Sequence, residues 1–279
     1  MKSVGACNLL YVVGTPIGNM EDITLMALRV LEEVPLIAAE DTRKTRRLLE
    51  RHGIKTRVTS FHDHSDESKL SQLVEHMQRE DLALVSEAGM PNISDPGHDL
   101  ILAAIENSVP VTPIPGPTAA IAALAVSGLP TSQFTFVGFL PRKPTERRKL
   151  LVSVIGEGRT VVAYETPHRL HGALEDIDAV APGTRVTVCR ELTKLHEEVF
   201  RGSASEARVH FANPRGEFTL VIGGGSQSTP AGTDAQLDSA LRRLESEGVS
   251  GREAVERVSR EYGVRRNRVY RMWVEGHSP

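Results

Sequence analysis

The sequence is poor in cysteine, aromatic residues and net charge, and each shortage narrows the possible functions. Its two cysteines, Cys7 and Cys189, lie far apart and form no CxxC or His/Cys spacing typical of a metal site. Reduced thiols in a cytoplasmic protein are the simplest expectation. Aromatic residues make up 4% of the chain, which disfavours single-strand nucleic-acid binding by base stacking alone. The formal net charge is −3, so a polyanion partner would have to meet a local basic patch.

Long hydrophobic runs are missing as well. No stretch approaches the roughly 18 apolar residues of a membrane span. The apolar run at residues 9–13 lacks the length and the basic flank of a signal peptide. The sequence therefore predicts no membrane association. With 279 residues, the chain is near the length at which one core splits into two, so we expect two domains.

In the first 117 residues, short apolar runs alternate with amphipathic segments. The runs predict strands near 9–13, 36–39, 57–61, 82–85 and 109–114. The segments between them predict helices near 23–34, 42–51, 67–79 and 98–107. This alternation is typical of an α/β domain with a mainly parallel sheet, which we place at residues 1–117.

The pattern changes after residue 118, where an alanine-rich helix is predicted over 118–129. Strands follow near 134–139, 160–164, 185–189, 198–200 and 218–222, with helices near 146–155 and 168–180. Two of the later strands are joined by a short connection. We therefore expect a second α/β domain with a mixed sheet at residues 118–225.

The C-terminal part reads as a linker and a small helical module. Residues 226–235 are rich in Gly, Ser, Thr and Pro, as flexible linkers are. In residues 236–279, Ser250 followed by Glu253 fits a capping box, and Gly263 can end that helix. A second helix carries Val269 and Trp273 on one side. Two short helices with a tight connection indicate a helix-turn-helix-like module, for which simple docking is the alternative.

The predicted strands of the first domain all end in loops with glycine, proline or polar residues. In an open parallel sheet, ligands bind at the carboxyl ends of the strands. We therefore expect these loops to form a ligand site. They read GTPIGN (14–19), EDTRKTRR (40–47), HDH (62–64), SEAGMPNISDPG (86–97) and PGPT (115–118).

Several common sites do not fit these loops. GTPIGN lacks the G-x-G-x-x-G fingerprint, and Pro16 removes an amide donor, so a nicotinamide dehydrogenase is disfavoured. HDH could supply ligands to zinc or iron, but no partner cluster is visible, and we expect no metal. A substrate-binding or acid/base role for HDH competes with a solvated loop. EDTRKTRR is equally consistent with a helix start and with the floor of a polar pocket.

Two basic stretches stand out in this net-acidic chain: RKPTERRK (142–149) and RRNRVYR (265–271). Charge runs are usually solvated faces. Two of them beside a candidate ligand site favour a polyanionic partner.

Taken in order, the motifs resemble one family. LYVVGTPIGNMEDIT, LIAAEDTRKT, HDH, LVSEAGMPNISDPG, PIPGPTAAIAALAVSGLP, FVGFLPRK, YETPHRL and RELTKLHEE together resemble the ribosomal RNA small-subunit methyltransferase I family. That family belongs to the tetrapyrrole-methylase superfamily, the class III methyltransferases dependent on S-adenosylmethionine. The resemblance spans residues 9–224. It implies two α/β domains with S-adenosylmethionine in the cleft between them, and a homodimer. It also implies 2′-O-methylation of a cytidine in the decoding region of 16S (small-subunit) rRNA.

The resemblance also implies which residues contact S-adenosylmethionine. They are Gly14, Thr15, Pro16, Ala88, Gly89, Met90, Pro91, Gly116, Pro117, Thr118, Tyr164, Glu165, Thr166, Gly216, Glu217 and Phe218. The family commonly reads Ser-Asp-Ala-Gly-Thr-Pro where this chain has Glu87 and Met90 at the second and fifth positions. The absence of Lys and Arg from residues 84–97 suits a cationic sulfonium better than a phosphate.

The reaction needs a way to remove the proton of a ribose hydroxyl, because S-adenosylmethionine is already an activated electrophile. Orientation can supply ~7–11 kcal/mol and a general base roughly 10²–10⁴-fold. The candidate bases are Glu40, Asp41 and His64, and Asp41 is preferred. The candidates for contacts to rRNA or the 30S subunit are Arg43, Arg142, Lys143 and Arg147.

Two other functions remain open from the sequence. The first is methylation of a corrin precursor by a tetrapyrrole methyltransferase, which the basic segment at 142–149 disfavours. The second is a non-enzymatic regulator that binds nucleic acid through its C-terminal helices.

Overall fold

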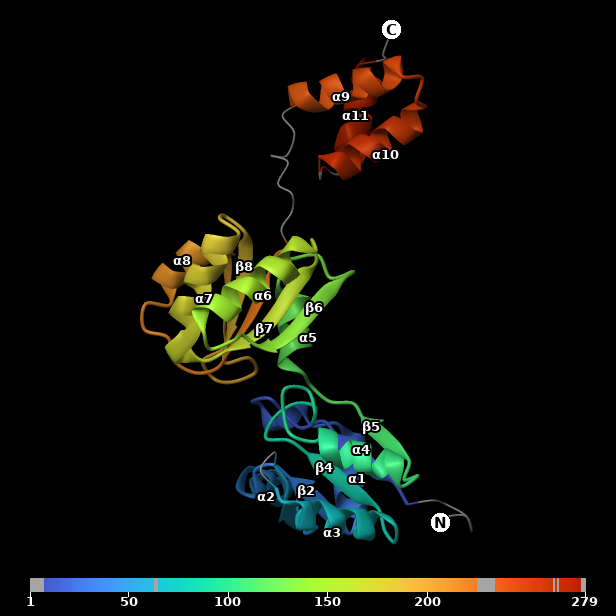
Figure 1. Ribbon diagram of the computed structural model, residues 1–279, viewed down its shortest axis with the longest axis vertical. Helices are drawn as coiled ribbons and strands as arrows, with labels where there is room; N and C mark the ends of the chain where they lie inside the picture. The colour runs from blue at the N-terminus through green and yellow to red at the C-terminus, as the bar shows by residue number, and fades with distance from the viewer. Residues whose placement is uncertain (1–7, 63–64, 225–233, 263, 265, 277–279) are drawn as a thin grey trace.

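The computed structural model describes residues 8–62, 65–224, 234–262, 264 and 266–276. It contains two α/β domains in succession along the chain, each with its own five-stranded sheet, followed by a small group of helices (Figure 1). The predicted α/β class is therefore confirmed.

The first sheet is entirely parallel, with the order β3-β2-β4-β1-β5. Its strands are β1 (Leu10–Val13), β2 (Leu36–Ala39), β3 (Arg57–Ser60), β4 (Leu82–Val85) and β5 (Val111–Ile114). The connecting elements are a 3-10 turn η1 (Met20–Asp22) and helices α1 (Leu25–Glu33), α2 (Thr42–Arg51), α3 (Glu67–Met77) and α4 (His98–Glu106). The strands are short and their carboxyl ends meet at one edge, where the loops gather.

Helices cover both faces of this sheet, which explains why its central strands β1, β2 and β4 read as continuous apolar runs. Along β4, Ala83 and Val85 pack in the cluster that holds α1 and α2. Leu82 and Leu84 point the other way, into the cluster that holds α3 and α4. With both faces covered, the strand ends remain for ligand binding.

The second sheet is mixed, with the order β6-β7-β10-β8-β9. Strand β6 (Phe134–Phe139) is parallel to β7 (Thr160–Glu165), whereas β10 (Phe218–Ile222) is antiparallel to both β7 and β8 (Arg185–Arg190). Strand β9 (Glu198–Ser203) pairs with β8 over six positions. The sequence predicted a shorter β9, ending at residue 200, but the pairing Arg185↔Ser203 carries the strand further.

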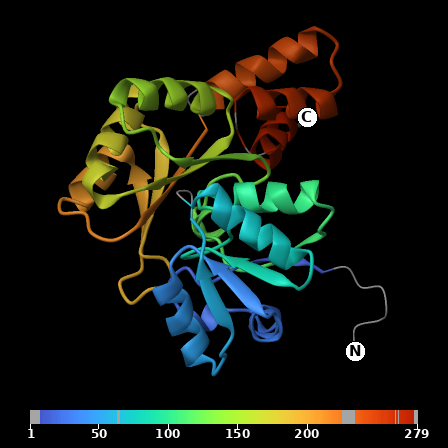
Figure 2. The ribbon, with the colours of Figure 1, turned by 60° about the horizontal axis from the view of Figure 1, so that its bottom comes forward.

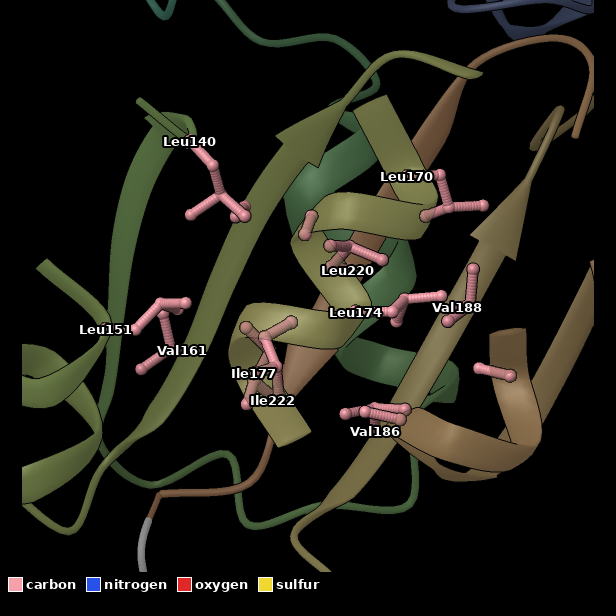
Figure 3. Close-up of a cluster of buried hydrophobic side chains, with 14 of the residues drawn as sticks. Leu140, Leu151, Val161, Leu170, Leu174, Ile177, Val186, Val188, Leu220 and Ile222 are labelled. Atoms are coloured by element: carbon pink, nitrogen blue, oxygen red, sulfur yellow. The ribbon is translucent and has the colours of Figure 1, made fainter. Parts of the chain in front are cut away.

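Helices also cover both faces of the second sheet. Helix α5 (Ala119–Val126) packs on one face against Val162 and Val221. Helices α6 (Pro144–Gly156), α7 (Pro167–Val180) and α8 (Ala204–His210) cover the other face. Figure 3 shows the core of that layer, where Leu174 of α7 lies beside Leu220 and Ile177 lies beside Ile222.

The C-terminal module contains three helices, α9 (Asp234–Ser246), α10 (Gly251–Glu261) and α11 (Arg266–Gly276), packed on one another around a shared core (Figures 1 and 2). Ser250 caps α10 by accepting a hydrogen bond from the Glu253 amide, which is one half of the predicted capping box, while the Glu253 side chain binds Arg257. Helix α9 was not predicted from the sequence, and its first two residues fall within the predicted linker. Residues 226–233 of that linker, and Gly263, lie outside the described residues.

None of the described helices has the length and apolarity that a bilayer crossing requires.

Candidate functional site

A cleft of about 360 Å³ lies at the carboxyl ends of the first sheet and is lined by both domains. This volume falls in the range of small-molecule sites, roughly 300–1,000 Å³. The first domain contributes Ile17, Glu40, Glu87, Ala88, Gly89, Met90, Ile93, Ser94 and Asp95. The second domain and the segment leading into it contribute Thr118, Ala119, Phe139, Tyr164, Glu165, Thr166, Pro167, Cys189, Leu192, Glu217, Phe218 and Thr219.

Three loops of the first domain are joined by their backbones next to this cleft. Thr15 and Gly89 exchange two amide hydrogen bonds, of 2.8 and 3.0 Å between N and O. Gly14 and Gly116 cross so closely that a Cβ on Gly116 would lie 2.7 Å from the Gly14 Cα. A Cβ on Gly14 would lie 2.7 Å from the Met90 sulfur. Only glycine fits at these two positions, which explains the first glycine of GTPIGN and the glycine of PGPT.

The loop after β4, residues 86–97, is held in an unusual backbone conformation. Gly89, Asn92 and Ser94 have φ of 87°, 70° and 65°, the left-handed region. For a non-glycine residue such as Ser94, this costs on the order of 1–3 kcal/mol and persists where surrounding contacts impose it. Here the Asn92 amide donates to the Pro96 carbonyl at 3.3 Å and the Ile93 amide to the Met90 carbonyl at 3.3 Å. The loop is thus a preformed wall.

Glu40 and Glu87 connect two of the loops at the cleft. The Glu40 carboxylate accepts a hydrogen bond from the Glu87 amide, with 2.9 Å between Oε2 and N. The Glu87 carboxylate in turn forms an ion pair with Lys44 of α2. Glu87, one of the two departures from the family pattern, therefore uses its side chain toward the neighbouring helix.

Asp41 has a different environment from Glu40. It is the N-cap of α2, and its Oδ1 accepts hydrogen bonds from the amides of Arg43, at 2.8 Å, and Lys44, at 3.2 Å. These backbone hydrogen bonds, aided by the Arg43 side chain, hold the pKa of Asp41 below its usual value. Asp41 is not among the cleft-lining residues, whereas Glu40 is. The segment EDTRKTRR (40–47) therefore serves both as a helix start, through Asp41, and as part of the cleft, through Glu40.

The second domain supplies an aromatic and acidic wall. The Tyr164 ring meets Phe139 edge-on, with 5.6 Å between centroids, and Phe136 at 5.1 Å. The adjacent Glu165 is buried, and burial raises its pKa although the Thr166 amide and nearby arginines act in the opposite direction. Its Oε1 accepts a 2.7 Å hydrogen bond from the Thr166 amide.

The turn before β10 is locked by Glu191. Gly216 has φ of 84°, and a Cβ there would lie 2.6 Å from the Glu191 side chain. Glu191 accepts from the Glu217 amide at 2.9 Å and from Lys194 Nζ at 3.0 Å. Burial alone would raise the pKa of Glu191, but these two donors bring it below its usual value. Gly216 therefore serves the turn, while Glu217 and Phe218 line the cleft.

The charged residues that line the cleft are all acidic, and three of them are paired with bases outside the lining: Glu87 with Lys44, Glu165 with Arg169 and Glu217 with Lys194. Its lining contains carboxylates at Glu40, Glu87, Asp95, Glu165 and Glu217, and all the lining residues belong to the described part of the chain. No Lys, Arg or His is among them. A site with this lining suits a cation better than a free phosphate.

The predicted cofactor residues fall into two groups. Those that line the cleft are Ala88, Gly89, Met90, Thr118, Tyr164, Glu165, Thr166, Glu217 and Phe218. Those outside the lining are Gly14, Thr15, Pro16, Pro91, Gly116, Pro117 and Gly216. The second group includes the close backbone crossings that shape the loops.

Several lining residues are not among the predicted site residues. They are Ile17, Glu87, Ile93, Ser94, Asp95, Ala119, Phe139, Pro167, Cys189, Leu192 and Thr219. Cys189 and Thr219 sit in buried strands and read as core. Ser94 and Asp95 lie in the loop that the sequence analysis selected, so their polarity was an available signal.

The predicted base and rRNA contacts are placed as follows. Glu40 lines the cleft, and His64 lies outside the described residues. The Arg43 side chain is 88% exposed, and Arg142 and Lys143 are exposed at the start of α6. The prediction for Arg147 is wrong, because its side chain is only 6% exposed and its guanidinium is bound to Asp176 and to backbone carbonyls.

Within the described residues, no three His, Cys, Asp or Glu side chains gather as metal ligands would.

Comparison with known proteins identifies the fold and then the family. The family model for tetrapyrrole (corrin/porphyrin) methylases matches residues 9–208. Among solved structures, uroporphyrin-III-C-methyltransferase from Thermus thermophilus superimposes with a TM-score of 0.54 at 22% identity, covering 78% of this chain and 94% of that chain. The cobalamin biosynthetic enzyme cobalt precorrin-4 methyltransferase gives a TM-score of 0.58 at 17% identity, covering 77% and 94%. The chain thus has the fold of the tetrapyrrole methylases.

More similar relatives narrow the assignment. Ribosomal RNA small subunit methyltransferase I of Halalkalibacterium halodurans is 42% identical, over 95% of this chain and 94% of the relative. The protein of that name from Escherichia coli O157:H7 is 40% identical over 95% and 94%. That from Thermotoga maritima is 46% identical over 77% and 98%. The chain belongs to the ribosomal RNA small subunit methyltransferase I family, within the tetrapyrrole methylases, and is a methyltransferase.

Proposed function

We propose that the protein transfers a methyl group from S-adenosylmethionine to the 2′-oxygen of a cytidine ribose in the decoding region of 16S rRNA. The observation that carries the proposal is a cleft with a wholly acidic charged lining, beside exposed basic residues, in a chain of this family. The cleft suits a cationic cofactor, whereas the basic residues suit a polyanionic substrate.

The cleft residues fit S-adenosylmethionine in charge and in shape. The carboxylates of the lining match a positive sulfonium, and the aromatic rings of Phe139 and Tyr164 offer apolar surface to an adenine. At Gly89 a backbone approach is open, because an added Cβ would find its nearest neighbour 3.6 Å away, at Ile17. When bound, the cofactor supplies a methyl group that is already activated for transfer.

The chain itself must hold the ribose hydroxyl and accept its proton. We propose Glu40 as the acceptor, because it lines the cleft and the Glu87 amide fixes its carboxylate. Asp41 is the weaker candidate, since both capping hydrogen bonds and a lowered pKa make its carboxylate a poor base. Glu40→Gln should lower turnover by roughly 10²–10⁴-fold with little change in cofactor affinity. Turnover of Glu40→Gln equal to wild type would exclude Glu40, and loss in Asp41→Asn alone would restore Asp41.

We propose that Arg43, Arg142 and Lys143 contact rRNA phosphates. Each phosphate contact contributes roughly one unit to the slope of log affinity against log salt. The double variant Arg43→Gln/Arg142→Gln should therefore bind small subunits with a slope lower by roughly two, at unchanged S-adenosylmethionine affinity. An unchanged slope would contradict these contacts.

The substrate class is tested by a direct choice. Radioactive methyl transfer from S-adenosylmethionine to small subunits, to free 16S rRNA and to a corrin precursor should label RNA and leave the tetrapyrrole unlabelled. Labelling of the tetrapyrrole alone would favour the corrin alternative. Binding of the full chain to duplex DNA without any transfer would favour the nucleic-acid-binding regulator.

We also propose a homodimer in the cytoplasm. Ile121 and Val126 on α5 and Phe134 on the edge strand β6 expose apolar surface in the second domain. Such surface is typical of protein–protein contacts. Light scattering of the purified protein should give twice the 30.5 kDa chain mass, and a value equal to one chain would contradict the dimer.

A further inference from the structure

Three consecutive carbonyl groups in the loop between β6 and α6 are bound by guanidinium groups. Arg147 Nη1 donates to the carbonyl oxygens of Pro141, at 3.2 Å, and Arg142, at 3.4 Å. Arg169 of α7 donates from Nη2 to the carbonyl of Leu140. Neither arginine belongs to this loop, so the loop backbone is fixed from two different helices.

Both guanidinium groups are anchored in turn by buried carboxylates. Arg147 Nε lies 2.6 Å from Oδ2 of Asp176, whose side chain is 3% exposed, and its Nη2 donates to the Gly172 carbonyl at 3.3 Å. Arg169 Nη2 lies 3.1 Å from Oε2 of Glu165, which lines the cleft. The loop is therefore tied to the cleft wall through Arg169 and to α7 through Arg147.

Such an arrangement is a poor way to gain stability alone. Burying an ion pair costs desolvation that its attraction often fails to recover, and apolar residues of similar size can stabilise as well or better. A planar guanidinium, however, presents several donors in a fixed fork and can hold carbonyls in one geometry. The observed network thus suits a need for a defined loop position.

The residues in and next to the loop explain why its position must be defined. Phe139, just before it, lines the cleft, and Arg142 and Lys143, at its end, are exposed and basic. We infer that Arg147 is a positioning residue that holds residues 140–143 so that Arg142 and Lys143 meet the rRNA backbone in register with the cleft. This inference rests on the proposed function, and it gives Arg147 an indirect part in substrate binding in place of the phosphate contact predicted from the sequence.

The test compares two variants that keep the positive charge. Arg147→Lys loses the guanidinium group, whose Nη1 binds the carbonyls of Pro141 and Arg142. Arg148→Lys is the matched control, because Arg148 Nε binds the other oxygen of Asp176 at 2.5 Å while its side chain is 53% exposed. For each variant, the KM for small subunits, the S-adenosylmethionine Kd, the Tm and hydrogen–deuterium exchange of residues 140–143 are measured.

We expect Arg147→Lys to raise the KM for small subunits by roughly ten- to a hundredfold, the scale of a small misplacement of a binding group. The S-adenosylmethionine Kd should stay within about twofold, amide exchange in the loop should rise, and Arg148→Lys should behave as wild type. Unchanged KM and exchange would overturn the inference. So would a cofactor Kd that weakens in parallel with KM, since Arg147 would then only support the domain.

A second variant and the exchange data cover two other outcomes. If Arg147→Lys does not fold, Arg169→Lys removes the hold on Leu140 from the other side and is expected to raise loop exchange and KM in the same way. If wild-type protein does not methylate small subunits, the proposed function fails, while the exchange data still decide whether Arg147 holds the loop.

Discussion

The two walls of the cleft are built in different ways. The first-domain wall is shaped by backbone contacts behind it, because Gly14 and Gly116 cross with no room for a Cβ and Thr15 and Gly89 exchange amide hydrogen bonds. The second-domain wall is a side-chain structure, in which Tyr164, Cys189 and Thr219 come from regular strands and Glu165 lies at the end of one. We therefore expect a large loss of cofactor affinity from substitutions at the backbone crossings of the first wall. In the second wall, the loss should depend on which side chain is removed.

The largest expected effect tests the backbone wall. In Gly116→Ala the new methyl group would lie 2.7 Å from the Gly14 Cα, so one loop must move away from the other. Overpacking of this kind typically costs 1–3 kcal/mol, or about ten- to a hundredfold in cofactor affinity if the bound form bears it. Calorimetric titration with S-adenosylmethionine measures it. Gly156→Ala is the control, because an added Cβ there meets nothing within 4 Å, and wild-type affinity in both variants would contradict the crossing.

An intermediate effect is expected from the side-chain wall. Glu165→Gln removes a buried carboxylate at the cleft wall, where it also binds Arg169, and should weaken S-adenosylmethionine binding by roughly tenfold, corresponding to about 1.4 kcal/mol. Glu217→Gln should change the affinity by less than about threefold, because that side chain is 74% exposed and solvent screens its charge. Equal losses of affinity in the two variants would show that the contribution of a carboxylate to binding does not depend on its burial.

The two walls also differ in how well the sequence predicts them. Strand-end loops marked by GTPIGN and PGPT follow from the topology of a parallel sheet, and the acidic character of residues 84–97 correctly indicated the charge of the cleft. Phe139 and Cys189 look like ordinary strand residues, and only the three-dimensional arrangement brings them to the site. Arg147 shows the reverse error, because a residue in a basic run was predicted to be an exposed contact. It is buried against Asp176, an acid that lies far along the chain.

A smaller effect is expected at Asp41, where substitution should change the stability of the protein. Asp41→Ala removes the N-cap of α2 and should lower the Tm by a few degrees at pH 7. The folded-state pKa of Asp41 is lowered, so its stabilisation is present above the unfolded-state pKa and is lost as pH falls through the folded value. The Tm difference between wild type and Asp41→Ala should therefore shrink below about pH 4. A difference that grows on acidification would contradict the capping role.

The smallest effect concerns Cys189, which lines the cleft from a buried strand. Burial raises its thiol pKa to about 11, so the reactive thiolate is scarce at neutral pH. In a Cys7→Ser background, labelling by iodoacetamide should stay slow up to about pH 9, and Cys189→Ala should alter cofactor affinity by less than about threefold. Fast labelling at pH 7 would show that the side-chain wall opens far more than the structure indicates.

The central claim is that this cleft serves methylation of a ribose in small-subunit rRNA. The most direct test incubates the protein with labelled S-adenosylmethionine and small subunits from cells that lack the protein, digests the RNA to nucleosides and identifies the labelled product. The account predicts label in 2′-O-methylcytidine at a site in the decoding region. Label on a base, on another ribose, or on no RNA at all would contradict it.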